Sequence, residues 1–589
     1  MDEAPEPNHG FDDSRRLTGP NRWFAGPAVT LTPLGRAAGD AAAHAAWAAR
    51  VCAACDALGW PDPQPLIERH ATGTLLVFAA PQDLLFTATE VNEWAWECAA
   101  ADAGETAFDR AQDLGDQATA TFAARAAAEV RPALAALRQA ADAHGVPLFE
   151  DDSEVSLGAG NGSRRWPREA LPAVDAVPWA ALHDVPTALV TGSNGKTTTV
   201  RLLAAMAAAA GRAPGCCNTE GVFVGGQAVE QGDYAGPAGA REVLRHRQVQ
   251  VAVLETARGG ILRRGLALRR ADVAVVTNIS PDHLGEYGIE DADDLAETKL
   301  VVARAVLHGG TLVLNADDAT LMAAAARLPH AAAARRALFA HEHEHPALAA
   351  LRAAGGSTCG VHAGALRLHH DGRDHELGAI AALPLALGGA ARHNIANLAA
   401  AALAGAALGL PLAAITATLR RFGASPGDNP GRLERWSHRG ATVLIDYAHN
   451  PDGLAQLLGV ARALQPKRLL LLLGQAGNRD DVAIVELART AAAFAPDRVV
   501  IKELPLMLRG RALGDVPALL EGGLLSAGLA AASIAVEADE ERAALGLLEL
   551  AEPGDVLVLP VHTAAVRERI TAHLAARRHD IQPAPGSTE

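Results

Sequence analysis

A glycine-rich segment between an apolar run and a helical run constrains the fold of this chain more than any other feature. Residues 191–199 read TGSNGKTTT and follow the apolar residues 187–190, which predict a buried strand. Residues 200–210 are rich in Leu, Ala and Met and predict a helix. Glycines between a strand and a helix let backbone N–H groups turn toward an anion at the helix N-terminus. The pattern predicts a phosphate-binding loop in an α/β domain.

The loop also carries the side chains that a nucleoside triphosphate requires. Lys196 supplies a positive charge for the β- and γ-phosphates, and the Thr197 hydroxyl can reach Mg²⁺. Only two residues separate Gly192 from Gly195, so the loop departs from the common spacing GxxxxGKS/T, and a plain glycine turn is the alternative. We predict ATP and Mg²⁺ as cofactors. The expected nucleotide contacts within the loop are Gly192, Asn194, Gly195, Lys196, Thr197 and Thr198.

Composition excludes several classes of protein. The chain has 589 residues, which leaves room for three or four domains of about 150 residues each. It carries 52 Lys and Arg against 68 Asp and Glu, and the net charge of -16 argues against a nucleic-acid partner. Neither a signal-peptide pattern nor a run of about 18 strongly apolar residues is present, so we expect a cytoplasmic protein without a membrane partner. The six cysteines, including a lone C-x-x-C at Cys52 and Cys55, are expected to stay reduced.

Strand and helix patterns alternate after the phosphate loop. Apolar runs at 249–254, 273–277 and 311–314 are separated by helical patterns, which indicates a parallel sheet with helices on both faces. Residues 337–391 alternate polar and apolar positions and suggest a small strand-rich insertion. A Gly/Pro/Asp-rich linker at 423–431 then leads to a second α/β unit. Its predicted strands are 442–445, 468–473, 498–501 and 556–559.

The N-terminal part mixes the two patterns, with a strand predicted at 73–79 and a long alanine-rich helix at 119–144. The predicted fold class is therefore α/β, with an N-terminal α+β domain, a central P-loop domain built on a parallel sheet with a small β insertion, and a Rossmann-like C-terminal domain. The expected boundaries are a disordered N-terminus at 1–15, domains at 16–175, 176–428 and 429–578, and a disordered tail at 579–589.

Three polar residues follow the strands predicted after the phosphate loop. Glu255 follows the run 249–254, His283 lies beyond the run 273–277, and Lys299 comes sixteen residues later. The carboxyl ends of parallel strands meet at one edge of a sheet, where ligands bind. A carboxylate, an imidazole and a hydroxyl at that edge can hold Mg²⁺, so we predict Thr197, Glu255 and His283 as metal ligands. Taken singly, such a Glu is usually a solvated loop residue, and such a His is a capping or core residue.

These motifs, in this order, resemble the Mur ligase superfamily. The resemblance rests on TGSNGKTTT, LETARGG, TNISPDHLG with Lys299 downstream, Arg392-His393-Asn394 with Asn397, Asn429-Pro430-Gly431-Arg432 and Asp446-Tyr447-Ala448-His449-Asn450-Pro451. Within that superfamily, GDYAGP at 232–237, ETARGGILRRGL at 255–266 and LTGPNRW at 17–23 are similar to the cyanophycin synthetases rather than to the peptidoglycan ligases. The resemblance covers the chain from about residue 185 onward, and the N-terminal part loosely.

The resemblance implies roles for residues outside the loop. Arg432 would join Lys196 in stabilising the transferring phosphoryl group, and Lys299 would bind Mg²⁺ as a carbamate. An ordinary lysine with a pKa near 10.4 is protonated, so the site would have to lower that pKa; a surface lysine in a helix beginning near Asp293 is the alternative. The other implied positions are Asn394 and Asn397 near adenine, Asp446 near ribose, and His449 and Asn450 facing the cleft between domains. The implied catalytic set is Lys196, Lys299, Arg432 and His449.

One departure from the resemblance narrows the reaction. Cyanophycin synthetases carry an ATP-grasp domain ahead of the Mur-like part, and the space between about Val155 and Val185 cannot hold one. The resemblance therefore implies a single ATP-driven amide bond instead of alternating polymerisation. The first candidate is arginine joined to an aspartyl side chain.

We therefore expect a ligase that activates a carboxylate as an acyl phosphate and joins it to the amine of an amino acid. The alternatives are a nucleotide-binding scaffold without turnover, and an amidotransferase subunit supplied with ammonia by a partner. The expected partners are amino-acid or dipeptide substrates and further copies of the chain in a dimer or tetramer. We expect the acid-bearing substrate on the N-terminal domain at Asn21, Arg22 and Trp23, which can equally be the start of a buried strand.

Overall fold

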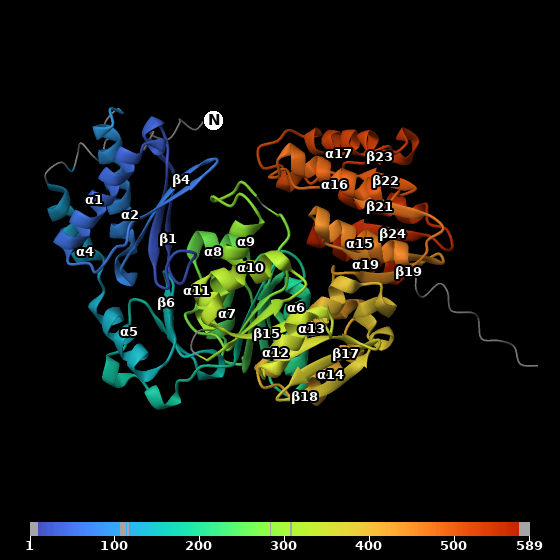
Figure 1. Cartoon of the computed structure of the whole chain (residues 1–589), viewed down its shortest axis with the longest axis horizontal. Helices are drawn as coiled ribbons and strands as arrows, with labels where there is room; N and C mark the ends of the chain where they lie inside the picture. The colour runs from blue at the N-terminus through green and yellow to red at the C-terminus, as the bar shows by residue number, and fades with distance from the viewer. Residues whose placement is uncertain (1–9, 106–113, 115–116, 283, 307–308, 577–589) are drawn as a thin grey trace, which may run out of the picture.

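A computed structural model describes residues 10–105, 114, 117–282, 284–306 and 309–576. Figure 1 shows the N-terminal elements in blue and the C-terminal elements in orange and red on either side of the green and yellow central part. Residues 1–9 of the N-terminus predicted to be disordered, and the predicted tail at 579–589, lie outside the described residues. Among the described helices none is both long and apolar enough to cross a membrane.

The N-terminal part begins with a four-stranded antiparallel sheet in the order β1-β2-β4-β3. Two 18-residue helices pack on it, and their buried side chains include Trp47 and Trp96. The bounds are β1 Phe11–Leu17, β2 Ala28–Pro33, α1 Ala41–Leu58, β3 Leu66–His70, β4 Gly73–Ala79 and α2 Leu85–Asp102. The strand predicted at 73–79 is β4.

Strand β1 corrects the prediction that residues 1–15 are disordered, because it begins at Phe11. The sequence of this segment does not show the alternation of apolar and polar residues that predicts a strand, because most of its residues are charged. It pairs with β2 along most of its length and buries Arg15 and Leu17, which lie two positions apart on one face. Arg15 can be buried because its guanidinium donates to the Leu262 carbonyl at 2.7 Å and lies beside the Asp13 carboxylate.

The helix predicted at 119–144 is two helices, α4 Ala118–Glu129 and α5 Pro132–His144. The break lies at Pro132, which has no N–H and disfavours helical dihedral angles at the residue before it. Arg131 accordingly has φ −111° and ψ 98°, which is extended. A three-stranded antiparallel sheet follows and leads to the central part, with β5 Leu148–Glu150, β6 Glu154–Leu157 and β7 Arg164–Pro167.

The central part is one 11-stranded sheet in the order β11-β10-β9-β12-β8-β13-β14-β15-β16-β17-β18. All pairs from β9 to β16 are parallel, and an antiparallel pair of strands extends each end. The strand bounds are β8 Thr187–Thr191, β9 Pro214–Asn218, β10 Gly221–Val224, β11 Gln227–Gln231, β12 Val251–Glu255, β13 Val273–Val276, β14 Thr311–Asn315, β15 Arg335–Glu342, β16 Thr358–His362, β17 Ala365–His370 and β18 Arg373–Ala379.

The strand-rich segment predicted as an insertion at 337–391 is therefore an edge of the central sheet. Strand β15 pairs in parallel with β14 and buries its apolar residues 337–340, so it continues the sheet without a gap. The polar alternation in β17 and β18 arises because these strands form the outer hairpin of the edge.

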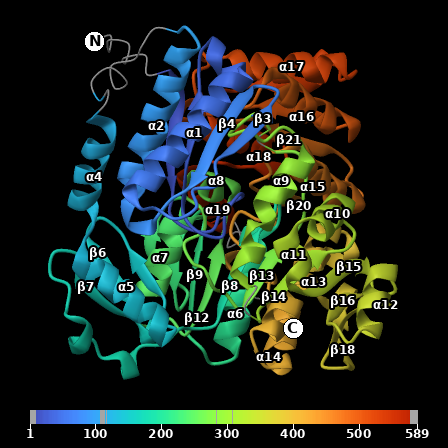
Figure 2. The same ribbon diagram turned by 60° about the vertical axis from the view of Figure 1, so that its left-hand side comes forward.

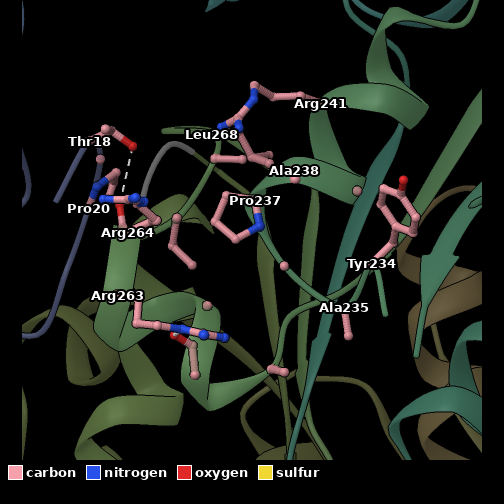
Figure 3. A pocket seen from close by; sticks show the side chains of 18 of the residues that line it. Thr18, Pro20, Tyr234, Ala235, Pro237, Ala238, Arg241, Arg263, Arg264 and Leu268 are labelled. Atoms are coloured by element: carbon pink, nitrogen blue, oxygen red, sulfur yellow. Dashed lines mark hydrogen bonds between the residues drawn. The ribbon is translucent and has the colours of Figure 1, made fainter. Parts of the chain in front are cut away.

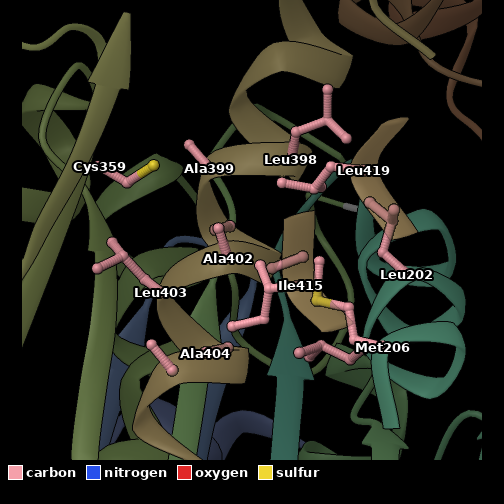
Figure 4. Packing of buried hydrophobic residues seen from close by; sticks show 14 of the residues in the cluster. Leu202, Met206, Cys359, Leu398, Ala399, Ala402, Leu403, Ala404, Ile415 and Leu419 are labelled. Atoms are coloured by element: carbon pink, nitrogen blue, oxygen red, sulfur yellow. The ribbon is translucent and has the colours of Figure 1, made fainter. Parts of the chain in front are cut away.

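Helices cover both faces of the central sheet. Ala188 and Val190 of β8 belong to the core under α6, α13 and α14, whereas Leu189 between them belongs to the core on the opposite face. Figure 4 shows α13 packed against Leu202 and Met206 of α6. The helix bounds are α6 Lys196–Ala209, α7 Pro237–Arg245, α8 Arg258–Arg264, α9 Ala292–Lys299, α10 Ala319–Arg327, α11 Pro329–Ala333, α12 Pro346–Ala353, α13 Arg392–Ala407 and α14 Leu412–Arg421.

The C-terminal part is a six-stranded sheet in the order β19-β20-β24-β21-β22-β23, parallel except between β19 and β20. Apolar residues on its two faces fall into two separate cores beneath the helices. This arrangement confirms the predicted α/β class. The bounds are β19 Glu434–His438, β20 Ala441–Asp446, α15 Pro451–Ala463, β21 Leu469–Leu473, α16 Asp481–Ala493, β22 Arg498–Ile501, α17 Asp515–Ser526, β23 Ile534–Val536, α18 Glu540–Glu549, β24 Val556–Pro560 and α19 Ala564–Ala576.

Candidate active site

The predicted phosphate loop connects β8 to α6 at the carboxyl edge of the parallel sheet. Gly192 and Gly195 have φ angles of 144° and 83°, which glycine tolerates and other residues rarely adopt. A Cβ at Gly192 would overlap the Thr277 hydroxyl, and a Cβ at Gly195 would overlap the Asn397 amide. Thr277 also donates to the Asn194 carbonyl at 2.6 Å. The two glycines therefore let β13 and α13 hold the loop closely.

Lys196 and Thr197 lie at the start of α6. The Lys196 Nζ donates to the carbonyls of Gly192 at 3.1 Å and Ser193 at 3.0 Å, so the side chain curls back over the loop. The Thr197 hydroxyl donates to Glu255 Oε2 at 2.8 Å. Two of the predicted metal ligands are thus in direct contact, although 58 residues separate them in the sequence. His283, the third, lies outside the described residues.

Glu255 is a buried carboxylate with an unused oxygen. It ends β12, only 1% of it is exposed, and Oε1 has no hydrogen-bond partner among the described residues. Burial raises the pKa of this carboxyl, and the nearby Lys196 acts in the opposite direction. A buried carboxylate oxygen without a partner, beside a hydroxyl, is a donor set that suits Mg²⁺. Thr197 and Glu255 therefore fit the predicted metal.

Lys299 is buried beside the phosphate loop. It is the last residue of α9 and is 4% exposed, and its Nζ donates to the Gly192 carbonyl at 2.9 Å. This placement excludes the surface lysine that was the alternative. Burial lowers the pKa of Lys299 well below its ordinary value, and the charge of Lys196 adds to the effect. The condition for a reactive neutral amine is met, and carbamylation stays a prediction.

Asn394 and Asn397 lie in the first two turns of α13, buried against the loop. The Asn397 amide donates to Asn394 Oδ1 at 3.1 Å, and the Asn394 amide donates to the Leu385 carbonyl at 3.3 Å. Both side chains thus brace the turn next to Gly195. Their predicted contact with adenine stays a prediction.

Arg432 reaches the phosphate loop from the linker before the C-terminal part. Its guanidinium donates to the hydroxyls of Thr197 at 3.4 Å and Thr219 at 3.2 Å, and lies 4.6 Å from the centre of the Tyr447 ring. Asp446, at the end of β20, accepts from the Leu433 backbone N–H at 2.6 Å. This contact ties the strand end to the segment that carries Arg432. The predicted contact of Asp446 with ribose stays a prediction.

The C-terminal part also contacts the loop directly. The Asn194 amide donates to Asp452 Oδ2 at 2.7 Å, and the Asn450 amide donates to Asn194 Oδ1 at 3.2 Å. His449 donates through Nδ1 to the Tyr447 carbonyl at 3.1 Å, and its Nε2 lies 3.6 Å from Asp282 Oδ2. His449 therefore lies next to a residue of the central part, and its predicted role at the cleft between domains stays a prediction.

Sequence reasoning missed the charged residues that join these parts. Arg479 forms an ion pair with Asp282 at 2.8 Å, and Arg201 donates to the Pro430 carbonyl at 2.8 Å. Glu220 binds both Arg201 and Arg567, from α6 and α19. Each partner is a common surface residue type in the sequence, and only the fold brings them together.

Arg22 does not serve the role predicted for it. Its guanidinium binds Glu68 at 3.0 Å, and Asp294 and Glu297 of α9 at 2.7 and 3.2 Å. It is 9% exposed and committed to these three carboxylates, so it is closed to a substrate. Asn21 builds the turn before it by accepting from the backbone of residues 23 and 24. This segment therefore joins the N-terminal part to the helix that carries Lys299.

A cavity of about 1650 Å³ opens beside the loop. Its walls come from all three parts of the chain and include Ser193, Lys196, Lys299, Tyr447 and His449. A single small ligand usually fills about 300–1,000 Å³, so the space exceeds what one small molecule needs.

Comparison with known proteins agrees with this geometry. Residues 190–405 match the Mur ligase middle domain, and residues 431–560 match the family described as Mur ligase, glutamate ligase domain. The UDP-N-acetylmuramoyl-L-alanyl-D-glutamate--2,6-diaminopimelate ligase of Gloeobacter violaceus is 31% identical over 385 residues, which is 63% of this chain and 70% of the relative. This chain belongs to the Mur ligase family.

Two cyanophycin synthetases are also similar to this Mur ligase family member. The protein of Synechocystis sp. is 34% identical over 404 residues, 68% of this chain and 46% of the relative. The protein of Trichormus variabilis is 37% identical over 340 residues, 58% of this chain and 37% of the relative. The chain thus spans less than half the length of these two relatives. A solved folylpolyglutamate synthase/dihydrofolate synthase with Mn, AMPPNP and L-glutamate bound aligns with a TM-score of 0.48 at 22% identity, covering 66% of this chain and 90% of that one.

Proposed function

We propose that this chain is an ATP-dependent ligase that joins a carboxylate to the amine of an amino acid. The observation that carries the proposal is the convergence of Lys196, the Thr197–Glu255 pair, buried Lys299 and Arg432 on one loop. They come from α6, β12, α9 and the linker before the C-terminal part. A plain glycine turn needs no such set of charges.

The residues suit the chemistry of carboxylate activation. When bound, Mg²⁺·ATP supplies the phosphoryl group that converts the carboxylate to an acyl phosphate, a better electrophile for the amine. Lys196 and Arg432 hold positive charge at the loop, where negative charge on the transferring group is stabilised. Thr197 and Glu255 offer oxygen ligands for the metal, and Lys299 as a carbamate would add another.

The C-terminal part closes the site against water. The Asn194–Asp452 contact joins it to the phosphate loop and the Asp282–Arg479 contact joins it to the segment after β13, and excluding water protects an acyl phosphate from hydrolysis. The fold also keeps His449 at this junction. We propose that it lines the place where the amine enters.

For the substrates, we propose an amino acid or dipeptide carboxylate and one amine, with arginine on an aspartyl side chain as the first pair to test. The proposal does not include alternating polymerisation. We further propose that the chain forms a dimer or tetramer. Tyr447 lines the cavity with the Arg432 guanidinium against its ring, and direct measurement decides which amine is used.

A substrate panel tests the function. Wild-type protein and Lys196→Ala are incubated with Mg²⁺·ATP and pairs of amino acids and aspartyl peptides, and ADP release and product masses are recorded. ADP formed with one new amide mass, in wild type alone, supports the ligase. If the protein binds an ATP analogue tightly but releases no ADP with any substrate pair, the alternative of a nucleotide-binding scaffold without turnover is supported. Extension of aspartyl chains by aspartate would contradict the single amide bond.

A further inference from the structure

Four arginines line one wall of the large cavity, on the side of the N-terminal part. Arg16 comes from β1, Arg241 from α7, and Arg263 and Arg264 from α8. We call these four residues the arginine cluster. Figure 3 shows Arg241, Arg263 and Arg264 around the pocket, with Arg263 extending from α8 toward Ala235 and Pro237. The proposed function assigns them no role.

The arginine cluster has no ion-pair partner among the described residues. Arg263 donates to the Gly259 carbonyl at 3.0 Å, and Arg16 stacks 4.0 Å from the centre of the Phe86 ring. Four arginines nearby do form ion pairs: Arg15 with Asp13, Arg138 with Asp83 and Glu150, Arg245 with Asp151, and Arg258 with Glu286. The lining also includes Arg168, which donates to the Asp151 carbonyl, Arg269, which donates to the Gln82 side chain, and Arg270. A group of positive charges without ion-pair partners favours an anion nearby, and the carboxylates of Glu129, Asp151 and Asp152 line the same cavity.

The guanidinium groups also repel one another. Burial lowers the pKa of Arg241, and its neighbours Arg245 and Arg264 lower it further. Burial also lowers the pKa of Arg16 and Arg264 adds to that effect, whereas the carboxylates of Glu129, Glu93 and Asp152 act in the opposite direction. Like charges gathered in this way are stabilised when an anion lies between them.

The cluster and the phosphate loop line the same cavity. Helix α8 begins three residues after Glu255 ends β12, so its arginines lie beyond the same sheet edge as Lys196. Glycines line the cavity between α7 and α8, at Gly236, Gly239, Gly259 and Gly260. A Cβ at Gly260 would lie 3.0 Å from Pro237 Cδ, so a larger residue would narrow this space.

We propose that the arginine cluster binds anionic groups that the acid substrate carries in addition to the carboxylate being activated. The acid is then a multiply charged compound, whose reacting end lies at Lys196 and Lys299 and whose other charges lie on α7 and α8. This proposal rests on the proposed function for the reacting end. Guanidinium forks bind carboxylates and phosphates alike, so the distal groups are either of these.

Isothermal titration tests the proposal on the full chain. The probes are tri-aspartate and inorganic pyrophosphate, the latter with Mg²⁺·AMPPNP already filling the phosphate loop. The variant Arg263→Gln/Arg264→Gln removes two exposed charges. The matched control is Arg335→Gln/Arg373→Gln, which removes two exposed arginines of β15 and β18 that do not line the cavity.

We expect wild type and control to bind at least one probe, with affinity that falls as salt rises. The Arg263/Arg264 variant should bind that probe at least about tenfold more weakly and should bind Mg²⁺·AMPPNP as wild type does. Binding of tri-aspartate alone assigns carboxylates, and binding of pyrophosphate alone assigns phosphates. Equal binding by variant and control, or binding of neither probe by wild type, overturns the proposal. If wild type fails to bind AMPPNP or to release ADP, the proposed function is refuted. The two failures can be told apart because the tri-aspartate titration is done without nucleotide.

Discussion

Replacing Glu255 with Gln is the sharpest test of the metal assignment. The substitution keeps the shape of the side chain and the acceptor for the Thr197 hydroxyl, which donates to Oε2 at 2.8 Å. It removes the charge of a group that is 1% exposed and whose Oε1 has no partner among the described residues. The variant therefore changes electrostatics with little change in packing.

Without metal the variant should be more stable than wild type at neutral pH. Burial raises the folded-state pKa of Glu255 above its ordinary value of 4.5, so the folded protein binds more protons than the unfolded one between these two values. Wild-type stability accordingly falls as pH rises through that window, and the whole penalty is present above the folded pKa. Burying a carboxylate costs more than burying a neutral amide. A pKa raised by one corresponds to about 1.4 kcal/mol, so we expect Gln to stabilise by about 1 kcal/mol at pH 7 and the gain to vanish near pH 4.5.

Adding Mg²⁺·AMPPNP should reverse the order. A ligand at roughly 100 times its Kd stabilises the folded state by about 2.7 kcal/mol, and wild type alone keeps the charge that holds the metal. Urea unfolding midpoints with and without Mg²⁺·AMPPNP measure the reversal, and ADP release should fall by about 100-fold or more in the variant. Glu230→Gln, at an exposed position of β11, serves as the control. A Glu255→Gln protein that Mg²⁺·AMPPNP stabilises as much as wild type would refute the assignment.

Three further predictions concern the same site. Lys196→Ala should abolish ADP release without moving the urea midpoint, because Nζ contacts loop carbonyls at the surface of a glycine turn; normal turnover would contradict its role. Lys299→Met tests the buried amine. Burial and the charge of Lys196 lower the pKa of Lys299 in the folded state, so between that pKa and 10.5 the unfolded state binds more protons than the folded state. The stability of wild type should therefore rise with pH, relative to the variant, by up to about 1.4 kcal/mol per pH unit. If the urea midpoints of wild type and Lys299→Met changed with pH in parallel, the lowered pKa of Lys299 would be contradicted. Arg22→Met should lower kcat several-fold with little change in AMPPNP affinity, because it removes the ion pair between the N-terminal part and α9. Arg50→Met is the control, because it breaks an ion pair with Asp102 inside the N-terminal part and should leave kcat unchanged. Equal effects of the two substitutions would show that Arg22 has a merely structural role.

The parts of the fold that are coded locally could be predicted from the sequence. Strands β8, β13 and β14 are continuous apolar runs bounded by turns, as buried parallel strands are, and their predicted ends agree with the structure to within one residue. Strand β1 was missed because its partner β2 comes from a separate segment and its own residues are mostly charged. Pro132 indicates the break between α4 and α5, but the alanine-rich residues on both sides favour a single continuous helix.

The candidate site divides in the same way. The loop from Gly192 to Thr198 is one continuous segment, so its geometry follows from glycine, a helix start and a lysine. The contacts of Asn194 with Asp452 and of Arg22 with Asp294 span 258 and 272 residues, and no local pattern encodes them. The arginine cluster likewise depends on distant contacts, one of which is the hydrogen bond from the Thr18 backbone to the Arg264 carbonyl at 2.8 Å that joins the segment after β1 to α8.

The N-terminal part therefore contributes residues to the lining of the cavity. Strand β1 and the turn after it hold α8 through Arg15, Thr18 and the Pro20 carbonyl, which accepts from the Leu266 N–H at 2.8 Å (Figures 1 and 2). Arg22 holds α9 in the same way. These two helices follow β12 and β13, the strands whose ends face the phosphate loop, and they carry Arg263 and Arg264 of the arginine cluster and Lys299. A domain that grips both helices fixes the distance between the distal anions of the substrate and the activated carboxylate, so it sets the length of acid that the site accepts.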